Sequence, residues 1–108
     1  MKRVYVAGPY THGDVEANVR EAIAASDMLL EAGYAPYCPH MSHFWHRQHP
    51  HDYETWMALD MAWLAQCDAL IRLPGESPGA DREVLFAQHH NIPVYYGWSE
   101  FLIAEVTA

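Results

Sequence analysis

The chain has 108 residues, a length that predicts a single domain over 1–108. Hydrophobic residues make up 51% and charged residues 19%, which excludes an intrinsically disordered or low-complexity protein. Six Lys and Arg residues against fourteen Asp and Glu residues give a formal net charge of -8. We expect no nucleic acid polymer as a partner, because this charge would repel a phosphate backbone.

The sequence also gives no sign of secretion or of a membrane partner. The apolar stretch near the start, 4–7, is far shorter than that of a signal peptide, and no stretch reaches the about 18 apolar residues of a membrane helix. Two cysteines, Cys38 and Cys67, are too few for a disulfide scaffold, so we expect two buried thiols in a reducing compartment. These features predict a cytoplasmic protein.

Short apolar stretches alternate with helical patterns from the first residues onward. Residues 4–7 predict a strand that is buried on both faces. Residues 14–30 carry apolar side chains at helical spacing and predict a helix with Asp14 as its N-cap. Residues 34–38 predict a strand at the edge of the sheet, because Pro36 cannot donate a hydrogen bond to a neighbouring strand.

The rest of the chain continues this alternation. In order, we expect a loop over 39–51, a helix over 53–66, a strand over 69–73, a helix over 78–90, a strand over 92–96 and a short helix that ends at 106. Asp52, Ser77 and Ser99 are the expected N-caps, and Pro78 suits a first helical position.

Strands that alternate with helices imply right-handed crossovers and a parallel sheet covered on both faces. We predict an α/β, flavodoxin-like (Rossmann-like) three-layer domain with a four- to five-stranded parallel sheet in the order 2-1-3-4. Ligands of such sheets bind beyond the carboxyl ends of the strands, where the winding direction reverses. This rule selects four segments: 8–13, 38–40, 73–79 and the turn at Gly97.

The turn over 75–80 leads from a buried strand into a helix N-terminus. Free backbone N–H groups and the helix dipole attract an anion such as phosphate there, and Ser77 adds a hydroxyl donor. An ordinary capped turn is the alternative. The turn matches neither a Walker A loop nor a GxGxxG fingerprint.

Glu83 lies in the second turn of the helix that follows. Its side chain should lean back over Ala80 and Gly79, whose small size leaves an open space for the carboxylate. This position suits a nucleophile or a base. The alternative is an acid that merely stabilises the helix dipole, by about 0.3–1 kcal/mol.

Asp60 belongs to an apolar helix face, four residues after Trp56 and close to Trp63 and Leu64. An unpaired carboxylate is costly to bury, so this side chain must either line a pocket or pair with the backbone or an arginine.

Five histidines between 39 and 51 have nearly regular spacing and resemble a metal cluster: His40, His43, His46, His49 and His51. No Cys pair or HExxH accompanies them, so we expect no metal and no cofactor but a solvated loop. Aromatic side chains in and after it could stack on a flat base: Phe44, Trp45, Tyr53 and Trp56.

Three segments carry a family resemblance: YVAGPY at 5–10, DMAWL at 60–64 followed by CDAL at 67–70, and SPGADRE at 77–83. With these motifs the chain resembles the nucleoside 2-deoxyribosyltransferase superfamily over residues 3–96. It is most similar to small homologues and to the 2′-deoxynucleoside 5′-monophosphate N-hydrolases. Two departures are a Pro9-Tyr10 pair in place of Ser-Ile and the His-rich segment, which has no counterpart in the hydrolase pattern.

The resemblance implies an enzyme that cleaves or transfers the N-glycosidic bond of a (deoxy)nucleoside or its 5′-monophosphate. It implies catalytic roles for Glu83 as nucleophile, Asp60 as second acid and Tyr5 as active-site tyrosine, with Ser77 on the 5′-phosphate. The expected substrate-binding residues are Gly8, Pro9, Tyr10, His40, Trp45, Trp56, Gly75, Ser77 and Gly79. A homodimer or higher oligomer is also implied.

The chemistry agrees with these residue types. Cleavage passes through an oxocarbenium-like state, so one carboxylate traps C1′ while a proton reaches the departing base. In a hydrolase water then attacks C1′, and in a transferase a second base does so. The sequence leaves both alternatives open. Two other hypotheses also stay open: a non-catalytic nucleotide-binding module, and a metal protein built on the His-rich segment.

Overall fold

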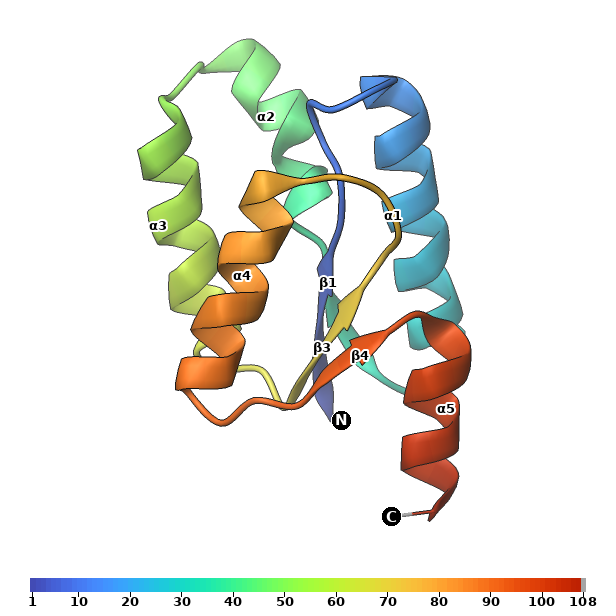
Figure 1. Ribbon diagram of the computed structural model, residues 1–108. Coiled ribbons are helices and arrows are strands. Elements are labelled where there is room, and N and C mark those ends of the chain that lie inside the picture. Colours follow the sequence, from blue (N-terminus) through green and yellow to red (C-terminus); the bar gives the residue numbers. More distant parts are fainter. Residues whose placement is uncertain (108) are drawn as a thin grey trace.

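A computed structural model describes residues 1–107 and contains one parallel four-stranded sheet between two layers of helices (Figure 1). The strands are β1 (Arg3–Ala7), β2 (Ala35–Tyr37), β3 (Ala69–Arg72) and β4 (Val94–Tyr96). Their order is β2-β1-β3-β4, which confirms the predicted order and the edge position of the strand that contains Pro36. In the register, Tyr5 of β1 lies between Tyr37 of β2 and Leu70 of β3.

Two helices cover each face of the sheet (Figure 1). On one face lie α1 (Val15–Glu31) and α5 (Trp98–Thr107), and on the other lie α3 (Tyr53–Leu64) and α4 (Pro78–His89). A 3-10 turn, Pro39–Met41, and the short helix α2 (Ser42–Gln48) lie beyond the carboxyl ends of the strands. None of the helices in residues 1–107 has the length and apolarity to cross a membrane.

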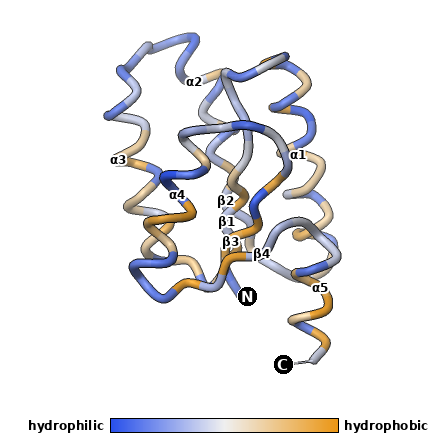
Figure 2. The backbone as a smooth tube through the Cα atoms, in the orientation of Figure 1, coloured by the Kyte–Doolittle hydropathy of each residue, from blue (hydrophilic) through white to orange (hydrophobic). Residues whose placement is uncertain are grey.

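The core has two halves because side chains of a strand alternate between the two faces of the sheet. Tyr5 and Leu70 are buried under α3 and α4, whereas Val4 and Val6 are buried against α1 and α5. Figure 2 shows hydrophobic colour concentrated in the sheet and in turns of α4 and α5. The prediction of a first strand buried on both faces is confirmed.

Three predicted caps are confirmed. The side chains of Asp14, Asp52 and Ser77 accept hydrogen bonds from backbone N–H groups in the first turns of α1, α3 and α4. The prediction for Ser99 is wrong, because α5 already begins at Trp98 and places this serine inside the helix.

The predicted loop over 39–51 is also wrong, since most of it is helical. Pro39 is tolerated because a first helical position needs no N–H donor. The helix α2 ends at Gln48, and His49 leaves the helical region because it precedes Pro50. Of the two free thiols, Cys38 is buried as expected, but Cys67 is only half-buried.

The loop between β3 and α4 packs tightly against the loop after β1. Gly75 adopts a φ of +114°, and a Cβ atom built there would lie 2.7 Å from Cγ of Pro9. Both the left-handed backbone and the contact therefore require glycine at this position.

We expect Gly75→Ala to lower the free energy of unfolding more than Gly97→Ala, a matched control. Gly97 has a φ of +96° but nothing within 4 Å of the added carbon, so it reports backbone strain alone. That strain costs about 1–2 kcal/mol, and the collision with Pro9 should add roughly 1–3 kcal/mol. Urea denaturation measures both; equal losses would show that the contact with Pro9 is unimportant.

Candidate active site

A cavity of about 410 Å³ opens at the carboxyl ends of β1 and β3. Its walls come from the loop after β1, the Pro39–Met41 turn, α2, α3 and the first turns of α4. Pockets that enclose small molecules span about 300–1,000 Å³. The cavity therefore lies where ligands bind in this class of sheet and has the size for one.

Glu83 of α4 reaches this cavity and is 5% exposed. The hydroxyl of Tyr5, which is fully buried in β1, donates a hydrogen bond to Oε2 of Glu83. Ala80 and Gly79 line the same cavity, one turn before the carboxyl group. The small residues thus leave space beside Glu83, and no arginine occupies it within the described lining.

Asp60 provides a second buried carboxyl group from α3. Its Oδ1 accepts a hydrogen bond of 3.3 Å from the hydroxyl of Tyr37. The ring of Tyr37 is stacked between those of Tyr5 and Trp63, at centroid distances of 5.5 and 5.7 Å. Each carboxyl group thus accepts a hydrogen bond from a tyrosine hydroxyl, and the two tyrosines lie on neighbouring strands because the register places Tyr5 beside Tyr37.

Burial makes both carboxyl groups hard to ionise. Burial, together with the smaller effect of the charge of Asp60, raises the pKa of Glu83 to about 8, although the hydrogen bond from Tyr5 acts in the opposite direction. Burial also raises the pKa of Asp60 to about 6. Burial and the charge of Glu83 raise the pKa of Tyr5 well above its usual value, so its hydroxyl remains a donor.

The N-terminus of α4 forms another wall of the cavity. Ser77, Pro78 and Gly79 line it, and Oγ of Ser77 accepts a hydrogen bond of 3.1 Å from the N–H of Ala80. Arg72, buried at the end of β3, is not among the residues that line the cavity. It donates to the carbonyl oxygens of Leu73 and Gly75 and to Asp81, so it holds the loop in place.

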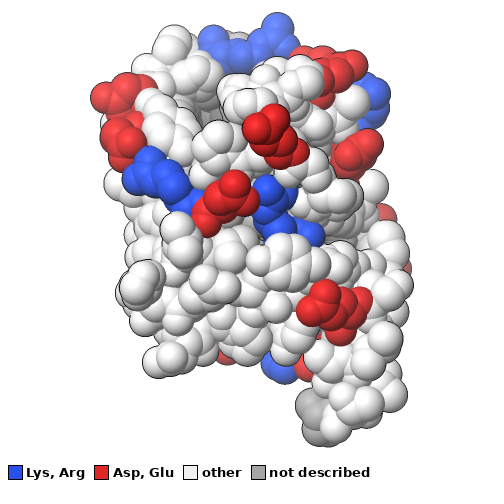
Figure 3. Space-filling view, viewed as in Figure 1, with Lys and Arg blue, Asp and Glu red and all other residues white. Residues whose placement is uncertain are grey.

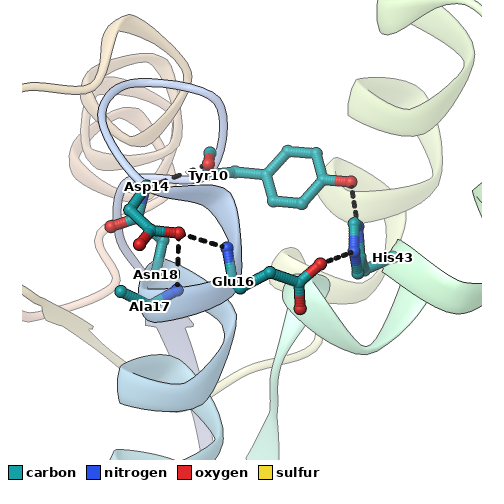
Figure 4. Close-up of polar contacts among 6 residues, drawn as sticks. All are labelled: Tyr10, Asp14, Glu16, Ala17, Asn18 and His43. Atoms are coloured by element: carbon teal, nitrogen blue, oxygen red, sulfur yellow. Dashed lines mark hydrogen bonds and ion pairs between the residues drawn. The ribbon is translucent and has the colours of Figure 1, made fainter.

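Three side chains connect the loop after β1 to two helices (Figure 4). The hydroxyl of Tyr10, which lines the cavity, lies 2.5 Å from Nδ1 of His43. Nε2 of His43 lies 3.3 Å from Oε1 of Glu16 in α1. Because the Glu16 carboxylate can only accept a hydrogen bond, Nε2–H of His43 donates to it and Nδ1 accepts a hydrogen bond from the Tyr10 hydroxyl. These contacts link α2 to α1 and to the loop after β1.

Several predicted site residues line the cavity: Gly8, Tyr10, His40, Trp56, Asp60, Ser77, Gly79 and Glu83. Others lie outside this lining. Tyr5 lies beneath Glu83, and Pro9 accepts a hydrogen bond of 2.8 Å from Nε2 of His40 through its carbonyl oxygen. Gly75 packs against Pro9, and Trp45 is 51% exposed, edge-on to Trp56.

The sequence did not predict part of the cavity lining. Ser42 and His46 of α2 and Met57 of α3 line the cavity but were not predicted to do so. Ser42 and His46 are four residues apart and share a face once 42–48 is helical. This spacing had no meaning as long as the segment was predicted to be a loop.

The metal hypothesis finds no support in the part of the chain that is described. Among residues 1–107, no three His, Cys, Asp or Glu side chains lie close enough together to hold a metal ion. Three of the five histidines of the segment 39–51 have separate partners: His40 contacts Pro9, His43 contacts Tyr10 and His46 contacts Trp56.

A family model described as a domain of unknown function (DUF7768) matches residues 2–97. The chain belongs to the DUF7768 family. No curated protein matches it. Among solved structures, this DUF7768 domain is similar to a 2-deoxyribosyltransferase from the psychrotolerant bacterium Bacillus psychrosaccharolyticus. The identity is 17% and the TM-score 0.65, over 85% of this chain and 69% of that one, so the two share a fold.

We expect the stability of the DUF7768 domain to fall as pH rises from about 4.5 to about 8, the usual and the raised pKa of Glu83. In this range the folded state keeps a proton that the unfolded chain has lost, so each pH unit lowers the free energy of unfolding by up to about 1.4 kcal/mol. Glu83→Gln should flatten this slope, which denaturation at several pH values measures.

The matched control is Glu76→Gln, an exposed carboxylate in the loop before α4. It should keep the wild-type slope. A wild-type slope that survives in Glu83→Gln would contradict the buried, proton-holding state of Glu83.

Proposed function

We propose that this domain cleaves or transfers the N-glycosidic bond of a (deoxy)nucleoside or a nucleoside 5′-monophosphate, with Glu83 as the nucleophile. The observation that carries this proposal is the pair of buried carboxyl groups, Glu83 and Asp60, in one cavity of about 410 Å³. The fold shared with a 2-deoxyribosyltransferase supports nucleoside glycosyl transfer as the general reaction class.

The pair suits the two tasks of the reaction. The Glu83 carboxylate attacks C1′ and forms a glycosyl ester, while the C1′–N bond breaks and its electron pair leaves with the base. The form of the pair that reacts has Glu83 ionised and the proton on Asp60, and Asp60 gives this proton to the base. Tyr5 stabilises the ionised Glu83 through its hydrogen bond before the attack.

The second step regenerates Glu83. Water attacks C1′ in a hydrolase, or the nitrogen of a second base does so in a transferase, and the ester bond to Glu83 breaks. Asp60 takes up the proton from the attacking group.

The 5′ end of the substrate would lie at the start of α4. Free N–H groups and the dipole of this helix favour an anion, and Ser77 presents its hydroxyl there. No lysine or arginine is among the described residues that line the cavity. A 5′-hydroxyl and a 5′-phosphate are therefore both candidates for this end.

One observation favours a second candidate function, a non-catalytic nucleotide-binding module. A pKa of about 8 leaves most of the Glu83 carboxyl groups protonated at pH 7. A protonated carboxyl group can donate a hydrogen bond to a bound ligand without taking part in a reaction. Such a module would bind without turnover.

We expect release of free base when the protein is incubated with a panel of 2′-deoxynucleosides, ribonucleosides and their 5′-monophosphates. Glu83→Ala should lower the rate at least about 10³-fold, and Asp60→Asn about 10²–10⁴-fold. Chromatography with and without a second free base measures hydrolysis and transfer separately. Glu76→Ala is the control. Binding without base release, unchanged in Glu83→Gln, would support the non-catalytic module instead.

We also expect a bell-shaped pH dependence of kcat/KM, with flanks at about 6 and about 8. Between these values the two carboxyl groups hold one proton, as the reaction requires, and they titrate as a pair. Asp60→Asn should leave only one flank. A rate that does not change with pH over this range would exclude the shared-proton mechanism.

We further propose a homodimer or higher oligomer. Trp63, Leu85 and Tyr96 are all more than half exposed, at 53%, 57% and 60%. Figure 3 shows few charged side chains over the lower part of α3, α4 and β4, whereas charges gather near the top of the view. An uncharged surface with large apolar side chains is typical of a subunit contact.

A further inference from the structure

The His-rich segment contains one imidazole whose protonation is fixed by its neighbours. Nδ1 of His46 accepts a hydrogen bond of 2.8 Å from Nε1–H of Trp56 and another of 3.3 Å from the backbone N–H of His51. An indole N–H and a backbone N–H can only donate. Nδ1 of His46 therefore carries a lone pair, and the ring proton lies on Nε2.

The orientation of this ring is fixed as well. His46 lies edge-on to Trp56 at a centroid distance of 5.7 Å, and Trp56 is in turn flanked edge-on by Trp45 and His51 at 5.0 and 5.5 Å. His46 lines the cavity, and within residues 1–107 its Nε2–H makes no hydrogen bond. The fixed ring therefore leaves Nε2–H of a cavity-lining residue available as a donor to a bound ligand.

This donor belongs to a ring that contacts Trp56, one turn of α3 before Asp60. Trp56 and Asp60 are four residues apart on α3 and both line the cavity, so they are separated by about 6 Å along the helix axis. His46 is hydrogen-bonded to Trp56, so it lies at the Trp56 end of the cavity wall that α3 provides. A base whose glycosidic nitrogen is at Asp60 would extend its far edge toward His46.

We propose that His46 determines base specificity by donating its Nε2–H to a keto oxygen on the far edge of the base, and that Trp56 is the positioning residue that fixes this proton. The inference rests on the proposed function, because it takes C1′ to lie beside Asp60 and Glu83. An exocyclic amino group at the same place would set two donors against each other and leave both without a partner.

Binding of free bases tests this without any bond cleavage. Hypoxanthine and adenine share a purine ring, but hypoxanthine has a keto oxygen and adenine an amino group at C6. By calorimetry at neutral pH, the wild type should bind hypoxanthine at least about 10-fold more tightly than adenine. His46→Ala should reduce this ratio to about 1. His49→Ala, a change at an exposed histidine of the same segment, should keep it.

Trp56→Phe keeps an aromatic ring but removes the indole N–H, so it should also reduce the ratio. Its readout is independent of ligand: ¹⁵N NMR of the histidine side chains should show an unprotonated Nδ1 for His46 in the wild type and a mixture of tautomers in Trp56→Phe. Circular dichroism identifies any variant that has lost the fold. If a variant does not fold, the proposal is judged by the wild-type NMR result and the wild-type binding ratio.

Three results would overturn the proposal: equal or tighter binding of adenine, a ratio that survives in His46→Ala, or a wild-type His46 protonated at Nδ1. Failure to bind either base would also overturn it. Base binding as expected without base release from any nucleoside would instead reject the proposed catalysis and leave the recognition by His46 intact.

Discussion

The hydrogen bond from Tyr5 to Glu83 joins the middle of the sheet to the second turn of α4, and the candidate site is arranged around it. Tyr5 is fixed because β1 pairs with strands on both sides and is buried on both faces. Glu83 is fixed because α4 packs on the same half of the core. The carboxyl group is thus held at one point of the cavity, whereas a surface glutamate would sample many rotamers.

Removal of water is the second constraint at this site. Burial of a carboxylate is unfavourable unless it is hydrogen-bonded or paired with a cation. In this domain tyrosine hydroxyls provide the hydrogen bonds: Tyr5 donates to Glu83, and Tyr37 donates to Asp60. Arg72 is hydrogen-bonded to the loop before α4 and to Asp81, and not to either acid of the site. Because burial outweighs the charges of the nearby arginines, the pKa of Glu83 stays raised, and burial also raises the pKa of Asp60.

Much of the fold could be predicted from the sequence because its signals are local. The alternation of strands and helices indicated a parallel sheet covered on both faces, and the flavodoxin-like order that we chose for it is confirmed. Pro36 indicated the edge strand, and Asp14, Asp52 and Ser77 indicated three helix starts. The helix over 42–48 could not be predicted, because histidine and aromatic residues form no apolar stripe there. The proline residues at 39 and 50 bound that helix instead of interrupting it.

The two acids of the candidate site and Tyr5 could be predicted, but the partner of Asp60 could not. Glu83 and Asp60 stand out because each is a charge among apolar or small neighbours. Tyr37 could not be recognised as the partner of Asp60, since that contact depends on the register of β2 against β1. His46 depends on the packing of α2 against α3, which no local pattern specifies.

The most direct measurement of the central idea is the mass of the protein after reaction with a nucleoside whose sugar carries fluorine at C2′. The fluorine withdraws electrons and slows the breakdown of a glycosyl ester, so the intermediate accumulates. The account predicts a mass increase of one fluorinated sugar, located by peptide mapping at Glu83 and absent from Glu83→Gln. Base release with no sugar attached to the protein, or a sugar attached at another residue, would contradict it.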